Sequence, residues 1–320
     1  MGVTVTVGPR PFSDAMHDFA RTVGGSDPVT VVGGRGAWTV GGSPDPSARE
    51  VTAPAGVIEF EPAEMTVRVG AGTTIRHLTD VLAPAGQKVV LPSCPDGTIG
   101  GALCVGWSDL RRLGEGPVRE ALLEASVVTS EGRLVRCGGP TVKNVTGYDL
   151  CRLAVGSLGT LFLLGEVVLR TRPLPAASEW VRGVCDDPWT LARPRLAASA
   201  APLEPSAVLW DGTTVWVLLE GHEGDVTDAV DALGTRALHP CEGPPALPPH
   251  RWSIDPADLA ATVAGSAEPF IAEVGVGTVH HTRPGFPRTA PAGVRSLSHR
   301  MKSLFDPTGR LNPGRDVLAP

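Results

Sequence analysis

The chain has 320 residues, a net charge of −6 and a hydrophobic fraction of 42%. This length predicts more than one domain, and the apolar content is enough for a full core. The chain has no basic run, and aromatic residues make up only 5% of it. Nucleic acid and anionic membrane are therefore not expected as partners.

The cysteines indicate a reduced protein without a metal cluster of its own. None of the six forms a CxxC pair, so neither a zinc ribbon nor an iron–sulfur cluster is expected in this chain. The sequence shows neither a signal peptide nor an apolar stretch long enough to span a bilayer. We therefore expect a cytoplasmic protein with free thiols, no metal and no membrane span.

The first half of the chain alternates helices and strands. Residues 13–24 have apolar residues at helical spacing, with Ser13 as the N-cap. Further on we expect a strand entering a glycine-rich loop at 27–42, two strands at 56–72, a helix at 73–86 capped by Thr73 or Thr74, a second glycine-rich loop at 91–106 and a strand–turn–strand at 121–139.

The second half begins after Pro175, where the composition turns to Ala and Pro. Here we expect a hairpin at 207–221 turning at Asp211-Gly212, a helix at 224–234 capped by Asp225 or its neighbour, a loop at 241–252, a strand with glycine breaks at 269–281, and a helix running into a turn-rich tail at 296–315. Such alternation with prominent hairpins predicts an α+β fold and not a run of βαβ units.

The most informative segment is 138–166, GGPTVKNVTGYDLCRLAVGSLGTLFLLGE, which contains the only tyrosine, Tyr148. Gly156, Ser157 and Gly159 interrupt its apolar run. Glycines there lose packing and cost backbone entropy, unless another surface must lie flat against the backbone. A planar cofactor is one such surface, and a tightly packed neighbouring strand is the alternative.

Two glycine-rich loops follow predicted strands. The first contains Gly33, Gly34, Arg35, Gly36 and Ala37, and the second contains Gly97, Thr98, Gly100 and Gly101. Backbone N–H groups in such loops can converge on a phosphate. Neither the complete GxGxxG fingerprint nor a GxxxxGK[ST] loop is present. Tight turns in a glycine-rich chain are the alternative.

Four motifs occur in one order: GGRGA, GTIGG, KNVTGYDLCRLAVGSLGTLFLLGEV and FDPTGRLNPG. Together they resemble the FAD-linked oxidases of the vanillyl-alcohol oxidase (PCMH-type) superfamily, and within it the FAD-binding E subunit of bacterial glycolate oxidase. The resemblance implies a PCMH-type FAD-binding domain built of two α/β subdomains at 1–173, a smaller α+β cap at 174–290, and a return of 291–320 to the FAD domain.

The resemblance also implies which residues contact FAD. The two loops above and Pro92 are expected around the phosphates and ribitol. Further contacts are implied for Gly147, Tyr148, Asp149, Gly156, Ser157, Gly159, Val168 and Asn312. Because the first loop has Ala37 or Trp38 where covalently flavinylated members have His, we expect non-covalent FAD.

For catalysis, the sequence offers His280, His281 and Arg283 as candidates for the base and the carboxylate ligand. Adjacent residues of a strand point to opposite faces, so the two His are not expected to share a metal. A surface His or a hydrogen-bonded core His is the alternative.

The first functional hypothesis is an FAD-dependent oxidoreductase acting on the CH–OH group of a 2-hydroxy acid such as glycolate or D-lactate. The second is a non-catalytic FAD-binding assembly or electron-relay subunit of a glycolate oxidase-like complex. In both, the resemblance implies sister flavoprotein and iron–sulfur subunits, through which the chain could associate with a membrane.

Overall fold

The computed structural model describes residues 10–139, 149–192, 203–285 and 290–318. Its contacts divide the chain into two compact units. The first comprises Met1–Trp107, Arg119–Arg172 and Thr289–Ala319, and the second comprises Ser108–Val118 and Pro173–Arg288. The expected division after residue 173 keeps 108–118 with the first domain, whereas the contacts group this segment with the second unit.

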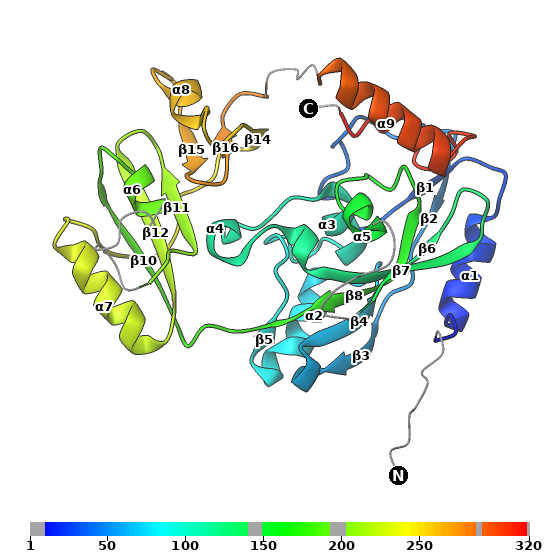
Figure 1. The fold of residues 1–320 in the computed structure, drawn as a ribbon, viewed down its shortest axis with the longest axis horizontal. Helices are drawn as coiled ribbons and strands as arrows, with labels where there is room; N and C mark the ends of the chain where they lie inside the picture. The colour runs from blue at the N-terminus through cyan, green and yellow to red at the C-terminus, as the bar shows by residue number, and fades with distance from the viewer. Residues whose placement is uncertain (1–9, 140–148, 193–202, 286–289, 319–320) are drawn as a thin grey trace, which may run out of the picture. The chain divides into compact units, whose positions relative to one another are not determined.

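An antiparallel sheet lies at the centre of the first unit, with the strand order β3–β4–β8–β6–β7 in the described part of the chain (Figure 1). Its strands are β3 (Val57–Glu61), β4 (Thr66–Gly70), β6 (Leu122–Val128), β7 (Leu134–Gly138) and β8 (Leu163–Arg170). Strand β8 is buried at every residue but the last, in agreement with its mainly apolar sequence, and its one buried charged residue, Glu166, accepts a hydrogen bond from the Ser13 hydroxyl.

Shorter elements surround this sheet. Strands β1 (Val29–Val31) and β2 (Arg49–Val51) pair in parallel, and β5 (Gln87–Lys88) pairs with β9 (Arg172–Pro173). The helices are α1 (Asp14–Val23), α2 (Ile75–Leu82), α3 (Ile99–Val105), α5 (Leu150–Ala154) and α9 (Ala292–Phe305), with 3₁₀ turns η1 (Pro62–Glu64), η2 (Ala83–Ala85) and η3 (Val118–Glu120).

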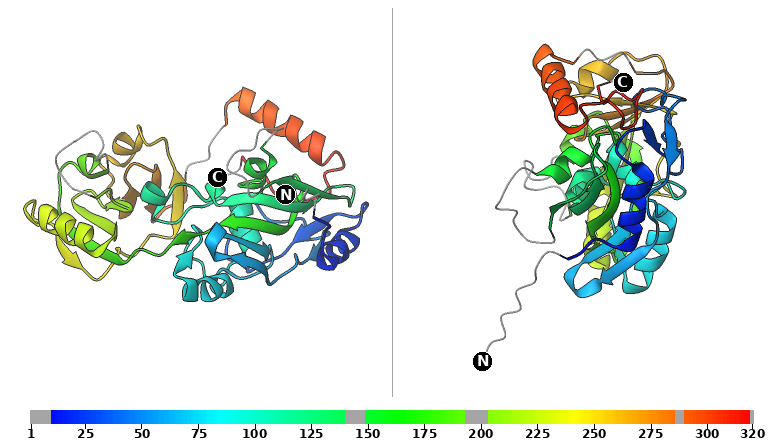
Figure 2. Two further views of the ribbon diagram at one scale, coloured as in Figure 1. Left: turned by 60° about the horizontal axis from the view of Figure 1, so that its bottom comes forward. Right: turned by 90° about the vertical axis from the view of Figure 1, so that its right-hand side faces the viewer.

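Helix α1 forms where the sequence predicts it. The Ser13 hydroxyl accepts a hydrogen bond from the Met16 N–H and caps the helix. Met16, Phe19 and Val23 recur at helical spacing and are buried in one core with residues of β1, β2, β6 and β8. Both orientations in Figure 2 place α1 beside the sheet. A Cβ at Gly165 of β8 would lie 2.3 Å from the Met16 sulfur, so only glycine allows this close packing.

The C-terminal tail returns to the first strands through buried polar contacts. The Asp306 carboxylate accepts hydrogen bonds from the Arg310 and Leu311 N–H groups, at 3.1 and 2.8 Å. The buried Arg310 guanidinium donates to the carbonyls of Val23 and Ser130, at 2.7 and 3.0 Å. These bonds hold the segment after α9 against β1.

The second unit contains an antiparallel sheet with the described strand order β13–β10–β12–β11–β15–β16–β14. Its strands are β10 (Ala177–Val184), β11 (Ala207–Trp210), β12 (Thr214–Gly221), β13 (His239–Cys241), β14 (His250–Ser253), β15 (Phe270–Glu273) and β16 (Thr278–His281). Its helices are α4 (Arg112–Glu115), α6 (Trp189–Ala192), α7 (Glu223–Gly234) and α8 (Leu259–Val263).

The expected α+β fold is confirmed, with local corrections. Residue His222 precedes α7, so Asp225 lies inside the helix and is not its cap. The segment 269–281 is not one broken strand but the hairpin β15–β16. The loop at 97–101 enters α3, whose N-cap is Thr98. In the last two cases, strand pairing and a helix cap formed regular structure where the glycines had predicted a strand break or a loop.

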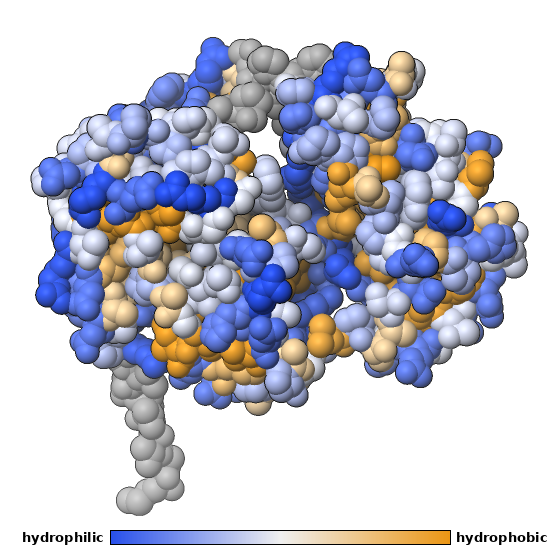
Figure 3. Space-filling model, turned by 180° about the vertical axis from the view of Figure 1, so that it is seen from behind, coloured by the Kyte–Doolittle hydropathy of each residue, from blue (hydrophilic) through white to orange (hydrophobic). Residues whose placement is uncertain are grey.

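No helix in the described ranges is both long and apolar enough to cross a bilayer. On the face shown in Figure 3, hydrophobic residues form several patches separated by hydrophilic ones.

Candidate cofactor-binding site

A cavity of about 210 Å³ lies within the first unit, between the two glycine-rich loops. Its lining is mainly apolar and comes from β1, the first loop, α2, α3 and the segment before β8. The sequence-predicted residues that line it are Gly33, Gly34, Arg35, Gly36, Ala37, Pro92, Gly97, Thr98, Gly100, Gly101, Gly159 and Asn312. The fold therefore brings residues of all four motifs to one cavity.

Some polar groups at this cavity have no hydrogen-bond partner within the protein, and a bound ligand could supply one. The Thr30 hydroxyl is buried, lines the cavity and has no hydrogen-bond partner in the structure. A buried hydroxyl such as that of Thr30 normally finds a partner. The first loop is exposed, and among the described contacts the backbone N–H groups of Gly33, Gly34, Arg35 and Gly36 have no protein acceptor, so a ligand can reach these donors. Several unused donors beside an apolar cavity fit a diphosphate that carries aromatic rings.

The glycines of the two loops have different roles. A Cβ at Gly34 would lie 2.1 Å from the Asp96 carbonyl oxygen, and one at Gly33 would lie 2.3 Å from the Thr98 hydroxyl. These two glycines allow the loops to approach each other. A Cβ at Gly36 would meet only the Cys94 sulfur, at 3.4 Å. The absence of a side chain at Gly36 therefore leaves space that a ligand could occupy, whereas Gly33 and Gly34 make room for another protein segment.

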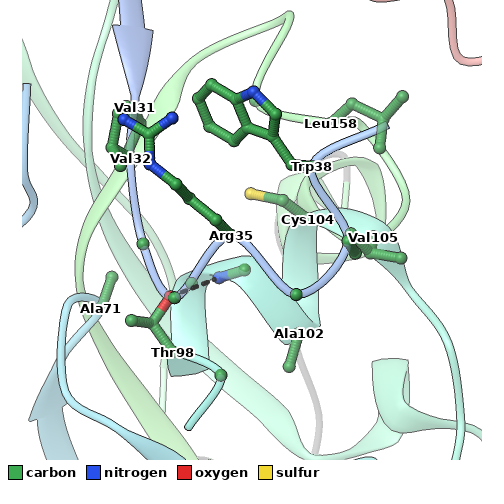
Figure 4. A pocket seen from close by; sticks show the side chains of 18 of the residues that line it. Val31, Val32, Arg35, Trp38, Ala71, Thr98, Ala102, Cys104, Val105 and Leu158 are labelled. Atoms are coloured by element: carbon green, nitrogen blue, oxygen red, sulfur yellow. Dashed lines mark hydrogen bonds between the residues drawn. The ribbon is translucent and has the colours of Figure 1, made fainter. Parts of the chain in front are cut away.

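Thr98 connects the second loop to α3. Its hydroxyl accepts a hydrogen bond from the Gly101 N–H at 3.2 Å, drawn as a dashed line in Figure 4. Burial raises the pKa of the neighbouring Cys104 to about 12, so this thiol stays neutral at physiological pH.

Two arginines lie over one tryptophan at the cavity. The Arg35 and Arg315 guanidinium carbons lie 4.4 and 5.1 Å from the Trp38 ring centroid. Figure 4 shows the Arg35 side chain beside the Trp38 indole. Arg315 also donates to the carbonyls of Val40 and Gly42, at 2.6 and 2.7 Å. Arg35 is ion-paired with Glu50 at 2.8 Å, so Arg315 is the cation that can add positive charge where an anionic diphosphate is expected.

Asn312 joins the tail to both sides of the cavity. Its Oδ1 accepts a hydrogen bond from the Val31 N–H at 2.9 Å, and its Nδ2 donates to the Leu158 carbonyl at 2.6 Å. A Cβ at Gly159 would lie 2.5 Å from this Nδ2. Gly159 therefore serves close protein packing as well as the cavity surface.

Other residues of the long motif lie elsewhere. Asp149 caps α5 and accepts a hydrogen bond from the Arg152 N–H. The Ser157 hydroxyl donates to the Ala154 carbonyl at 2.7 Å, and the Gly156 N–H donates to the Leu103 carbonyl at 3.0 Å. Val168 is buried within β8. None of Asp149, Gly156, Ser157 and Val168 lines the cavity, and Gly147 and Tyr148 lie outside the described residues.

The candidate catalytic residues belong to the second unit. His280 Nε2 lies 2.9 Å from the Glu273 carboxylate, which is 3% exposed. The second Glu273 oxygen, Oε2, is buried without a partner. Arg251 lies directly opposite His280 on the neighbouring strand, and its guanidinium donates to the Thr278 hydroxyl. These side chains share one face of the sheet.

His281 and Arg283 are used differently. His281 lies on the opposite face, where its ring stacks on Trp252 with centroids 4.1 Å apart. Burial lowers the pKa of His281, which favours the neutral ring. The exposed Arg283 forms an ion pair with Glu268. The structure therefore does not bring the three candidates together.

Comparison with known proteins identifies the cofactor. A family model described as "FAD binding domain" matches residues 20–138. The chain therefore contains a PCMH-type FAD-binding domain. FAD is accordingly its cofactor, and the orphaned donors and apolar walls of the cavity fit it.

Two of the similar proteins are named as an oxidase subunit and a dehydrogenase. Glycolate oxidase subunit GlcE of Escherichia coli (strain K12) is 30% identical over 225 residues, which are 68% of this chain and 63% of that protein. A D-lactate dehydrogenase of Archaeoglobus fulgidus is 34% identical over 105 residues, 32% of this chain and 24% of that one. The chain thus spans less than two thirds of the length of either relative.

A solved structure shares the fold. An alkyldihydroxyacetonephosphate synthase superposes with a TM-score of 0.66 at 14% identity, covering 93% of this chain and 74% of that one.

Several cavity residues were missed by sequence reasoning. Thr30, Leu158 and Arg315 line the cavity together with Trp38, which was considered only for covalent attachment. Leu158 has φ 51°, a left-handed conformation that no sequence signal indicates. For Arg315, the only sequence signal was its position directly after the NPG turn. Its contact with the first loop depends on how the C-terminal tail folds back.

Proposed function

We propose that this chain is an FAD-dependent oxidoreductase subunit that oxidises a 2-hydroxy acid such as glycolate or D-lactate and passes the electrons to a partner protein. The cavity with its orphaned Thr30 hydroxyl and loop N–H groups is the observation that carries the flavoprotein assignment. The names of the relatives GlcE and D-lactate dehydrogenase support the substrate class and the role as a subunit.

The first unit would hold the cofactor. The N–H groups of residues 33–36 would donate to the diphosphate, and Arg315 would offset part of its charge. The apolar side chains of the cavity would cover the rings and exclude water. When bound, FAD supplies a two-electron acceptor for the hydrogen on the substrate carbon.

In the second unit, His280 would accept the proton of the substrate hydroxyl group. The hydrogen bond to Glu273 places the proton of neutral His280 on Nε2, so Nδ1 is the atom that would accept the substrate hydroxyl proton. Glu273 would stabilise the charged imidazolium that results. Arg251, on the same face as His280, is a further candidate beside Arg283 for binding the substrate carboxylate.

A second candidate function is a non-catalytic FAD-binding assembly or electron-relay subunit. It is favoured by the engagement of two catalytic candidates, His281 and Arg283, in other contacts. Oxidation of the 2-hydroxy acid would then occur on a sister subunit.

Anaerobic titration of the purified, FAD-loaded chain separates these functions. Loss of the absorbance of oxidised flavin after adding glycolate or D-lactate is the expected result, and His280→Gln should slow it by about 100-fold. Persistent oxidised flavin in a chain that chemical reductant still bleaches would support the relay function instead. Wild-type rates in His280→Gln would remove this residue from the mechanism.

Substitution at Gly36 tests the cavity assignment. Gly36→Val should abolish FAD binding while the protein still folds, because its side chain would fill ligand space and meet only the Cys94 sulfur. The control is Gly224→Val, at a position with no heavy atom within 4 Å of an added Cβ and no positive φ. Flavin released by denaturation is the measurement. Wild-type flavin content in Gly36→Val would contradict the assignment.

A further inference from the structure

Helix α9 (Ala292–Phe305) presents an exposed apolar seam, which we define as Val294, Leu297, Met301 and Leu304. These residues follow one another at intervals of three, four and three, the spacing of a coiled-coil contact line. No residue of α9 is buried. Val294, Leu297 and Leu304 are 48%, 56% and 73% exposed. Met301 is half-buried, so the seam consists of three exposed apolar side chains around one that is partly covered.

The contacts that hold α9 are at its C-terminal end. Phe305 packs edge-on against Phe162, with ring centroids 5.8 Å apart. The Lys302 ammonium donates to the Thr160 carbonyl at 2.7 Å and to Asp306 at 2.6 Å. A helix of this length has marginal stability in water unless one of its faces packs. The seam, which begins two turns before these anchors, would gain stability from a partner.

The positive charge of α9 favours a partner with negative charge. The helix carries Arg295, Arg300 and Lys302 and no acidic residue, although the whole chain has a net charge of −6. Lys302 is already paired with Asp306, and Arg295 donates only to the Ala290 carbonyl in the described contacts. Arg300 precedes Met301 and so flanks the seam, at the position where coiled coils place partner-selecting charges.

We propose that α9 is a docking helix for another protein whose contacting element is an acidic amphipathic helix. A second copy of this chain fits less well, because pairing two α9 helices would place cations against cations. An anionic bilayer also fits less well. Helices that lie in a membrane interface have a broad apolar face with Trp or Phe, whereas this seam is narrow and aliphatic.

The test uses the full FAD-loaded chain and a synthetic helical peptide with Leu at positions a and d and Glu at e and g. Fluorescence anisotropy of the labelled peptide should show binding, and a peptide with Lys at e and g should bind at least about tenfold more weakly. Leu304→Glu should weaken binding of the acidic peptide by about tenfold or more. Val184→Glu is the matched control, since Val184 is also 73% exposed but lies on β10, and it should change nothing.

Arg300→Glu should reverse the preference between the two peptides, which an unspecific apolar contact would not do. Equal binding of both peptides, or of neither, would overturn the proposal. Self-association that Leu304→Glu abolishes would assign the seam to a second copy, and binding to phosphatidylglycerol vesicles that it abolishes would assign it to a membrane. Circular dichroism and flavin content identify variants that have not folded.

Discussion

At the residue scale, Asn312 shows how one side chain connects distant parts of the cofactor site. It joins β1 to the turn before β8 through one accepted and one donated hydrogen bond. Its φ of 44° is left-handed, a conformation that Asn adopts more readily than most residues. The sequence motif indicated a contact with flavin. The structure places Asn312 at the border of the cavity and adds a positioning role through its two hydrogen bonds, so the flavin contact stays a prediction.

Asn312→Asp tests this positioning role. The new carboxylate keeps an acceptor for the Val31 N–H but loses the donor to the Leu158 carbonyl, so two oxygens would face each other. We expect a loss of roughly 1–3 kcal/mol in the free energy of unfolding and a weaker affinity for FAD. Urea unfolding and flavin titration measure the two effects. Unchanged flavin affinity together with reduced stability would limit Asn312 to a structural role.

At the scale of elements, the segment Ser108–Val118 belongs to the second unit although the chain on both sides of it belongs to the first. Arg111 connects it to β12. Its Nε lies 3.0 Å from Glu220, and its Nη1 lies 3.2 Å from Asp109. The two carboxylate side chains are each 7% exposed, while Arg111 is 33% exposed. Removing the cation would therefore leave two largely buried carboxylates without the positive charge of Arg111, although Asp109 would keep its bond from the residue-111 N–H and Glu220 its bond from the Ser178 hydroxyl.

Arg111→Met should reduce the free energy of unfolding by about 2–4 kcal/mol, since an uncompensated buried charge is costly and solvent screens part of this one. The control is Arg133→Met, whose pair with Glu131 is 74% and 59% exposed. It should cost less than ~1 kcal/mol. The measurement is urea unfolding of both variants. Equal small losses in the free energy of unfolding would show that the Arg111 cluster does not anchor the segment.

At the scale of the whole molecule, the two units have separate hydrophobic cores. One cluster joins α1 to β1, β2 and β8 in the first unit. Two others lie in the second unit, one around α7, β10 and β12 and one around α8, β15 and β16. Units with their own cores can unfold as separate transitions.

FAD should therefore stabilise one unit selectively. Because the cavity is lined by the first unit alone, FAD at about 100 times its dissociation constant should stabilise that unit by roughly 2.7 kcal/mol. Hydrogen exchange with and without FAD is the measurement, with increased protection expected in β1, α3 and β8. Equal protection of β10 and β12 would show that the units unfold together.

Several features could be predicted from the sequence because they depend on residues close together in the chain. Ser13 caps α1 through a residue three positions away, and Thr98 caps α3 in the same way. The apolar run of β8 predicts a buried strand without knowledge of its neighbours. The ordered motifs predicted FAD, which the family comparison confirms.

The remaining features depend on contacts between residues distant in the chain. The β15–β16 hairpin places His280 on Glu273 and turns His281 to the other face, and the pairing of β14 with β16 adds Arg251. Arg111 meets Glu220 across 109 residues, and Arg315 meets Trp38 from the opposite end of the chain. Local propensity predicts a helix, a turn or a loop from neighbouring residues. The distant contacts depend on the register of the strands and on where the C-terminal tail packs. Both are set by long-range strand pairing and core packing, which neighbouring residues do not specify.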